Sequence, residues 1–266
     1  PLDSNVYDKI SATDSFQGQT SKPVSITRFE IDTAAPNSPT SIWPKSPTNN
    51  NKPIFTGTGE AGSTISIFNG NDTQPIGIAN VGADGRWSYT PSAPLADGDY
   101  QLKANAIDGA GNISSVTATF TLTIDTKAPD APSQPILAPQ PNANGYINNN
   151  KPTLSGTAEA NSTVSLWNEN EKTPFASVIA NSSGQWVYTP DQPFADKSYS
   201  IFVTATDAAA NQSAASTNIK FNIDTMTPVI GLPIKSPPDL TNNPIITYAG
   251  TAEAGSKISL TIDAIP

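Results

Sequence analysis

A short segment that recurs three times constrains this chain more than any other feature. It reads Ile-Asp-Thr, with a proline three residues after the threonine, and it occupies residues 31–36, 124–129 and 223–228. The aspartates are 93 and 99 residues apart, which is the length of a small domain and too long for a solenoid repeat. Because proline has no N–H to donate to a strand ladder, each copy predicts the end of one domain and the start of the next.

This recurrence divides the 266 residues into two complete copies and two partial ones. We expect residues 33–126 and 127–225 to be complete repeats. Residues 1–32 are predicted to be the C-terminal part of a repeat, and residues 226–266 the N-terminal part of a further repeat. A partial copy by itself is too short to bury a core.

The strands of a complete copy can be read from alternation and turn signals. Apolar and polar side chains alternate in residues 63–68, which indicates a strand with one buried and one wet face. Turns rich in Gly, Asn and Asp separate about seven such strands, and no stretch has the pattern of a long amphipathic helix. The second copy repeats these landmarks, with its extra length mostly in residues 139–150. We therefore predict an all-β fold of tandem seven-stranded immunoglobulin-like β-sandwiches, arranged as an elongated rod.

The charge and composition exclude several classes of function. The net charge is −9, so a nucleic acid or an anionic membrane surface would be repelled. The sequence has no cysteine and no histidine, which removes disulfides, thiolate chemistry, the usual zinc sites and a histidine base. No apolar run approaches the roughly 20 residues of a membrane span. We expect a protein that is not an enzyme, binds no nucleic acid and does not insert into a membrane.

Several motifs recur in both complete copies with small changes. In the first copy they occupy residues 57–62, 85–91, 96–100, 106–112 and 124–129. Together they resemble the bacterial Ig-like repeats of very large surface adhesins and biofilm proteins exported by type I secretion. The resemblance covers essentially the whole chain and implies a calcium-stiffened stalk outside the bacterial cell. Three side chains differ between the copies, which puts any role for them in doubt: Asp84 becomes Ser183, Asp99 becomes Ser198 and Gly111 becomes Ala210.

Sandwich topology brings carboxylates from separate loops to each junction. When successive strands alternate in direction, the turn after the second strand and the loop before the last strand lie at the end where the chain enters. These two loops carry a glutamate and an aspartate in each copy, and that end faces the recurring Asp-Thr. The predicted metal-ligand sets are Asp32 with Glu60 and Asp108, Asp125 with Glu159 and Asp207, and Asp224 with Glu253.

Such groups, backed by loop carbonyls and by Asn112 or Asn211, are the hard oxygen donors that Ca²⁺ takes, six to eight at about 2.3–2.6 Å. Without a cation, two neighbouring carboxylates repel by roughly 1–4 kcal/mol. We expect Ca²⁺ to convert a repelling hinge into a rigid joint. The alternative is that the acids are turn residues, with Asp108 capping its own loop, Glu60 exposed and Asp32 only solubilising the linker.

The four tryptophans differ in their settings. Trp87 and Trp186 stand in strand patterns next to tyrosines, which predicts core packing. Trp43 and Trp167 have no counterpart in the other copy, and we expect them to be partly exposed. The acids Asp97 and Asp99 are neighbours on one short turn without an aromatic cleft, so a glycosidase site is not expected.

The expected function is mechanical. The chain is predicted to be a monomeric stalk segment on the bacterial cell surface, whose partners are the neighbouring repeats of the same chain. Host-surface glycan would be bound through other parts of the protein. Two alternatives remain open. The repeats themselves could recognise glycan at Trp43 or Trp167, or the segment could be a spacer of an extracellular polysaccharide-degrading enzyme.

Overall fold

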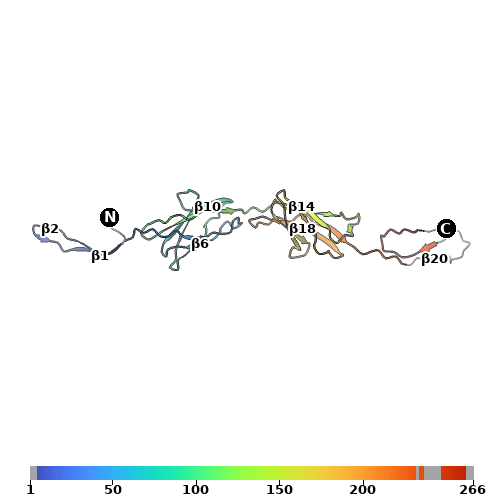
Figure 1. Ribbon diagram of the computed structural model, residues 1–266, viewed down its shortest axis with the longest axis horizontal. Coiled ribbons are helices and arrows are strands. Elements are labelled where there is room, and N and C mark those ends of the chain that lie inside the picture. Colours follow the sequence, from blue (N-terminus) through green and yellow to red (C-terminus); the bar gives the residue numbers. More distant parts are fainter. Residues whose placement is uncertain (1–4, 232–233, 237–246, 262–266) are drawn as a thin grey trace. The chain divides into compact units, whose positions relative to one another are not determined.

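The computed structural model describes residues 5–231, 234–236 and 247–261. Its described residues form strands, turns and irregular segments and contain no helix, so the predicted all-β class is confirmed (Figure 1). The chain divides into two compact units. The first comprises residues 1–131, 159–163 and 204–214, and the second comprises residues 132–158, 164–203 and 215–266.

Two antiparallel sheets build the first sandwich. The three-stranded sheet has the order β5-β6-β9, with β5 at Thr40–Ile42, β6 at Phe55–Thr58 and β9 at Arg86–Tyr89. The four-stranded sheet has the order β11-β10-β7-β8, with β7 at Thr64–Asn69, β8 at Gly77–Asn80, β10 at Gly98–Ile107 and β11 at Phe120–Ile124. A parallel bridge from Thr48 to Ile124 extends the second sheet at its β11 edge.

The first core lies between these sheets and follows the strand period. In β7, Ile65 and Ile67 are fully buried, as the alternation in residues 63–68 predicts, but Ser66 on the opposite face is also buried, so the expected wet face is not found. Trp87 of β9 is 3% exposed and pairs in register with Gly57 of β6. A Cβ on Gly57 would lie 2.8 Å from the Trp87 ring and 2.0 Å from the carbonyl oxygen of Thr40. The indole therefore needs glycine across the strand pair.

The second sandwich repeats this plan with one additional short strand. Its three-stranded sheet has the order β12-β14-β17, with β12 at Ile136–Ala138, β14 at Thr153–Thr157 and β17 at Gln185–Tyr188. Its five-stranded sheet has the order β13-β19-β18-β15-β16, with β13 at Tyr146–Ile147, β15 at Thr163–Asn168, β16 at Ala176–Ile179, β18 at Ser198–Thr206 and β19 at Ile219–Ile223. Strand β13 pairs in parallel with β19 and so extends what is a single bridge at Thr48 in the first copy.

Strand pairs near the two ends of the chain have registers similar to those of strand pairs in the two sandwiches. Strands β1 (Asn5–Ala12) and β4 (Val24–Ile31) pair Asn5 with Ile31, as β10 and β11 pair Gly98 with Ile124. Strands β2 (Ser15–Phe16) and β3 (Gln19–Thr20) continue that hairpin, and Phe16 is 75% exposed. Strands β20 (Ile234–Ser236) and β21 (Thr247–Ala249) pair as β12 and β14 do. Parts of the predicted end segments, residues 1–4, 232–233, 237–246 and 262–266, lie outside the described residues.

The close approach of Gly57 to Trp87 yields a stability prediction. Substitution Gly57→Ala should destabilise the first sandwich by about 1–3 kcal/mol, because the added methyl overlaps backbone and a buried ring. The measurement is urea unfolding followed by tryptophan fluorescence. Gly109→Ala is the matched control, since a Cβ there meets no atom within 4 Å. An unchanged midpoint for Gly57→Ala would contradict the packing described above.

Candidate functional site

The recurring aspartates form the same local turn in all three copies. One carboxylate oxygen of each accepts the backbone N–H two residues later, from Ala34 to Asp32 at 3.0 Å, from Lys127 to Asp125 at 3.1 Å and from Met226 to Asp224 at 3.1 Å. This is an Asx turn, which the turn-residue alternative expected at Asp108 and not at the recurring aspartates. One oxygen of each of these carboxylates is thus used by the backbone.

The loop before the last strand is capped by its own aspartate. Asp108 Oδ1 accepts the backbone N–H groups of Ala110 at 2.9 Å and Asn112 at 2.8 Å, and Oδ2 accepts Asn112 Nδ2–H at 2.8 Å. The Asn112 side chain is the main reason that the pKa of Asp108 is lowered; desolvation opposes this, and the backbone N–H donors add to it. Asp207 is held in the same way by the backbone and side chain of Asn211, at 2.9 and 2.8 Å.

Asn112 and Asn211, which hold the two loop aspartates, also bond to the backbone of the preceding junction. Asn112 Nδ2 donates to the backbone carbonyl of Asp32 at 3.1 Å. Within the first unit, Asn211 Nδ2 donates to the carbonyl of Asp125 at 2.8 Å, and Asn211 is only 8% exposed. Each asparagine therefore links the carboxylate of the loop aspartate to the backbone carbonyl of the junction aspartate.

A further contact in the first unit involves Asn49, which the sequence analysis does not single out. Its backbone N–H donates to the carbonyl of Ala209 at 3.1 Å, and its Nδ2 donates to the carbonyl of Ala210 at 3.0 Å. Ala210 has a φ of +74°, close to the +91° of Gly111 in the first copy. The alanine keeps the left-handed turn despite its Cβ, at a cost of about 1–2 kcal/mol.

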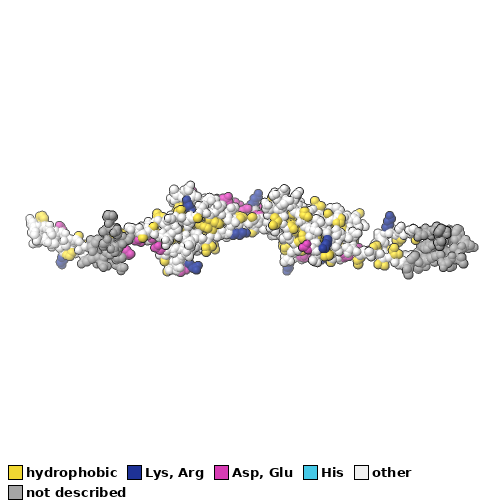
Figure 2. All heavy atoms as spheres, in the orientation of Figure 1, with side chains coloured by type: hydrophobic (Ala, Val, Ile, Leu, Met, Phe, Trp, Pro, Cys, Tyr) yellow, Lys and Arg dark blue, Asp and Glu magenta, His cyan; other side chains and the backbone are white. Residues whose placement is uncertain are grey.

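Three predicted ligands line one small cavity of the first unit. Its volume is about 120 Å³, and it is lined by Asp125, Glu159 and Asp207 together with Lys127, Ala128 and Asp130. Figure 2 shows acidic side chains gathered at one end of the first sandwich, with basic side chains close to them. The cavity thus brings four carboxylates to one place, of which Asp130 is not predicted from the sequence.

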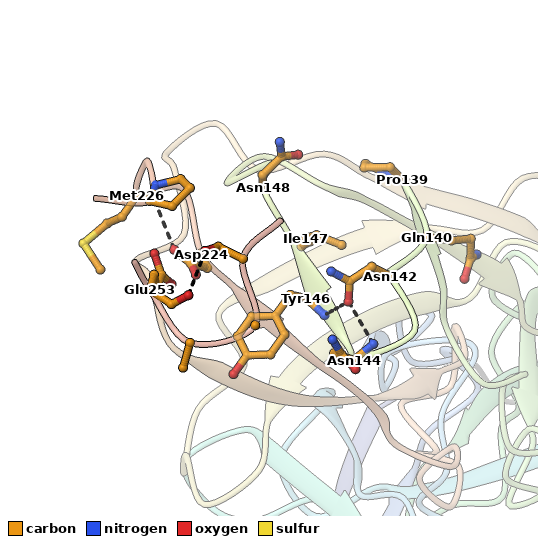
Figure 3. A pocket seen from close by; sticks show the side chains of 14 residues that line it. Pro139, Gln140, Asn142, Asn144, Tyr146, Ile147, Asn148, Asp224, Met226 and Glu253 are labelled. Atoms are coloured by element: carbon orange, nitrogen blue, oxygen red, sulfur yellow. Dashed lines mark hydrogen bonds between the residues drawn. The ribbon is translucent and has the colours of Figure 1, made fainter. Parts of the chain in front are cut away.

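Another cavity lies in the second unit and includes the last predicted pair. It has a volume of about 620 Å³, and its lining includes Asp224, Glu253, Tyr146 and several amide side chains. Figure 3 shows Asp224 and Glu253 toward one end of it, with Pro139 and Gln140 toward the other. Asn142 Oδ1 shapes the wall by accepting the N–H groups of Asn144 and Tyr146, both at 3.0 Å.

The glutamates of the predicted sets occupy equivalent turns. Glu60, Glu159 and Glu253 are exposed, and the backbone carbonyl of each accepts a serine hydroxyl three residues later at 2.7 Å. Among the described residues, no three Asp or Glu side chains are arranged to hold a metal ion as they stand. The structure brings predicted ligands to common sites without forming a complete carboxylate shell.

Comparison with known families settles what kind of domain carries these loops. A model of the bacterial Ig-like domain family matches residues 18–126 and 140–225, which is more than half of the chain. The chain belongs to the bacterial Ig-like domain family. Comparison with curated proteins gives no match. Among the described residues, no helix has the length and apolar character that crossing a membrane requires.

Several solved structures are similar to these bacterial Ig-like repeats. The fibronectin(III)-like modules of CbhA from Clostridium thermocellum share 17% identity over 69% of this chain and 94% of theirs, with a TM-score of 0.43. A tetra-tandem repeat from the extending region of a large adhesion protein shares 18% over 94% of this chain and 71% of its own, with a TM-score of 0.31. A solved chain from a 1.5-MDa bacterial ice-binding adhesin shares 20% identity over 82% of this chain and 74% of its own length, with a TM-score of 0.35.

The tryptophans of the bacterial Ig-like repeats take the predicted settings. Trp87 and Trp186 are 3% and 2% exposed and belong to the two cores. Trp43 is half-buried, stacks on Phe120 with ring centroids 5.7 Å apart and meets the Phe55 ring edge-on. Trp167 is also half-buried and stacks on Phe202 at 6.2 Å. Both of the unmatched tryptophans thus have aromatic partners within their own sandwich.

The cap on Asp108 generates a pH prediction. Asn112→Ala should raise the pKa of Asp108 toward its ordinary value of 3.8, because the largest lowering interaction is lost. Since the folded-state pKa is lowered, the stabilisation is complete above the ordinary value and disappears as pH falls through the lower folded value. Carboxyl ¹³C NMR titration measures the pKa of Asp108, and urea unfolding at several pH values measures the stabilisation. Asn71→Ala, in an exposed turn, serves as control, and an unchanged Asp108 titration in Asn112→Ala would refute the assignment.

Proposed function

We propose that this chain is a stalk segment of a large secreted bacterial adhesin, in which Ca²⁺ stiffens the junctions between successive Ig-like repeats. The stalk lies outside the cell, at the bacterial surface, and projects a distal region that binds the host or another surface. Its partners within this segment are the neighbouring repeats of the same chain. The observation that carries the proposal is the cavity next to the Asp125-Thr126 junction, lined by carboxylates from three separate loops.

The donor set of this cavity suits calcium. Carboxylate and carbonyl oxygens are the ligands that Ca²⁺ prefers, and Ca²⁺ tolerates irregular shells better than Mg²⁺ does. The ion would be held by Asp125, Glu159, Asp207 and Asp130. It would replace Lys127 as the positive charge next to these carboxylates. The bound ion would supply positive charge that joins loops on both sides of the junction. The fit lies in donor type and lining, since no preformed group of three acids exists among the described residues.

The same arrangement extends to the other two junctions. Asp32, Glu60 and Asp108 would serve the preceding junction, and Asp224 with Glu253 the following one. Asn112 draws Asp108 and the Asp32 backbone together in the first case. In the second, Asp224 and Glu253 line a common cavity. Each added repeat brings its own set of acids. Every junction of a stalk could therefore be stiffened in the same way.

A calcium titration tests the proposal. Extracellular calcium sites bind at about 10⁻⁴–10⁻³ M, so 10 mM Ca²⁺ should stabilise the folded chain by about 1.4 kcal/mol for a site with a Kd of 1 mM. We expect a higher Tm and a larger maximum dimension in small-angle X-ray scattering with Ca²⁺ than with excess chelator. Magnesium at equal concentration is the control ion. If neither quantity changes with Ca²⁺, the junction acids act only as turn residues.

A double-mutant cycle tests whether one ion joins the two sides of a junction. With Ca²⁺ present, Asp125→Ser and Asp207→Ser should be strongly non-additive in Tm, because either substitution removes the shared ion. In excess chelator this coupling through the ion should be lost, and any coupling that remains should have the sign of carboxylate repulsion, since either substitution then relieves the same charge. Asp84→Ser, in a turn outside the cavity, is the matched control. Additivity in both conditions would exclude a shared ion.

A further inference from the structure

A second carboxylate holds the junction from within the sandwich that ends there. Asp97 lies in the turn that precedes β10. Its Oδ1 accepts the backbone N–H of Thr126 at 3.1 Å, and its two oxygens accept the Thr126 hydroxyl at 2.9 and 3.1 Å. The ladder between β10 and β11 ends at the pair Gly98–Ile124. The carboxylate therefore fixes a residue two positions beyond the last strand pair.

The second copy contains the same clamp, in the second unit. Asp196 accepts the Thr225 backbone N–H at 3.1 Å and the Thr225 hydroxyl at 3.0 and 3.2 Å. The adjoining residues of this turn differ between the copies, since Gly98 becomes Lys197 and Asp99 becomes Ser198. The Asp-to-Thr contact thus persists although the turn around it has changed.

Each clamp completes the hydrogen bonding of the departing backbone. In the first copy the N–H of Asp125 donates to the carbonyl of Thr48, that of Thr126 to Asp97, and that of Lys127 to Asp125 Oδ1. Three successive N–H groups thus have acceptors, and a carboxylate is the strongest acceptor type for an N–H or O–H donor. Residues 125–127 are therefore fixed by hydrogen bonds to the sandwich and to each other, although the strand ladder ends at Ile124.

We propose that Asp97 and Asp196 are positioning residues that set the direction in which the chain leaves each sandwich, without a cation. This inference rests on the proposed stalk function, because exit direction matters only where one repeat must follow another in a defined orientation. The clamp and the proposed calcium site use different residues. The clamp lies within one sandwich and uses Asp97 and Thr126, whereas the proposed ion joins loops from both sides of the junction.

The absence of cysteine from the sequence allows a direct test. Spin labels on Ser88→Cys and Val187→Cys, at equivalent exposed positions of β9 and β17, report the distance between the two sandwiches by pulsed electron resonance. All samples contain excess chelator. The labelled parent in chelator gives the reference distance distribution, and Asp97→Ala should broaden it further, because Thr126 loses its contacts to the turn before β10. Amide hydrogen exchange should accelerate at Thr126 and stay unchanged at Asp125, whose N–H bonds Thr48.

Asp99→Ala is the matched control. It removes the same charge two residues later, at the start of β10, where Asp99 accepts the Thr123 hydroxyl across the strand pair at 2.6 Å. This control should keep the parent's distribution. Thr126→Val removes the hydroxyl contacts while leaving Asp97 in place, and it should broaden the distribution less than Asp97→Ala does. The double variant should match Asp97→Ala, because both changes act on one contact.

Failure of this inference can be told apart from failure of the calcium proposal. If Asp97→Ala gives the parent's distribution in chelator, the clamp does not position the chain, whatever calcium does to the Tm. If Asp97→Ala does not fold by circular dichroism, Thr126→Val decides alone, and an unbroadened distribution for it overturns the inference. If calcium has no effect on the parent while Asp97→Ala broadens the distribution, the clamp stands and the calcium joint does not.

Discussion

The hydrogen bonding of the Asp-Thr dipeptide is the constraint on which the rest of each junction depends. Proline soon afterwards ends the possibility of strand pairing, so the polar backbone groups there need partners from loops. Thr48 accepts from the Asp125 N–H, Asn211 donates to the Asp125 carbonyl, and Asp97 accepts from Thr126. Acidic and amide side chains converge at this end because the backbone requires them there. The carboxylate-lined cavity is a product of the same convergence.

Differences between the two copies show that local pairs of residues change together. Asp84 caps the backbone N–H of Arg86 in the first copy, and a Cβ on Gly82 would lie 2.7 Å from its Oδ1. In the second copy Ser183 replaces Asp84, and Asn181, in place of Gly82, supplies the capping oxygen to Gln185. The acceptor has moved by two residues while the turn is kept. The change from Asp84 to serine is thus explained by turn chemistry.

Patterns of short period predicted the fold well, whereas contacts of long sequence separation escaped prediction. Alternation in residues 63–68 and the repeat spacing indicated the sandwiches, and Trp87 and Trp186 were correctly placed in the cores. The Asp97 clamp was missed because it joins residues 29 apart through one side chain. The periodicity of a sequence does not show where a single carboxylate points. Asn49 was missed for the same reason, because its side chain bonds a carbonyl 161 residues later. Strand β13 lies in a segment with no alternation to reveal it.

The clamp also decides how such a chain would carry tension. If the chain is pulled at its ends, the load leaving a sandwich reaches Thr126 before it reaches β11. Two donor groups of Thr126 are tied to Asp97, in the turn before β10, so part of the force passes into the neighbouring strand at the point of exit. Peeling β11 from its edge then requires first breaking contacts to a charged acceptor, which are stronger than those of the ladder itself. The contact between Asp97 and Thr126 thus lowers the force that reaches β11 directly.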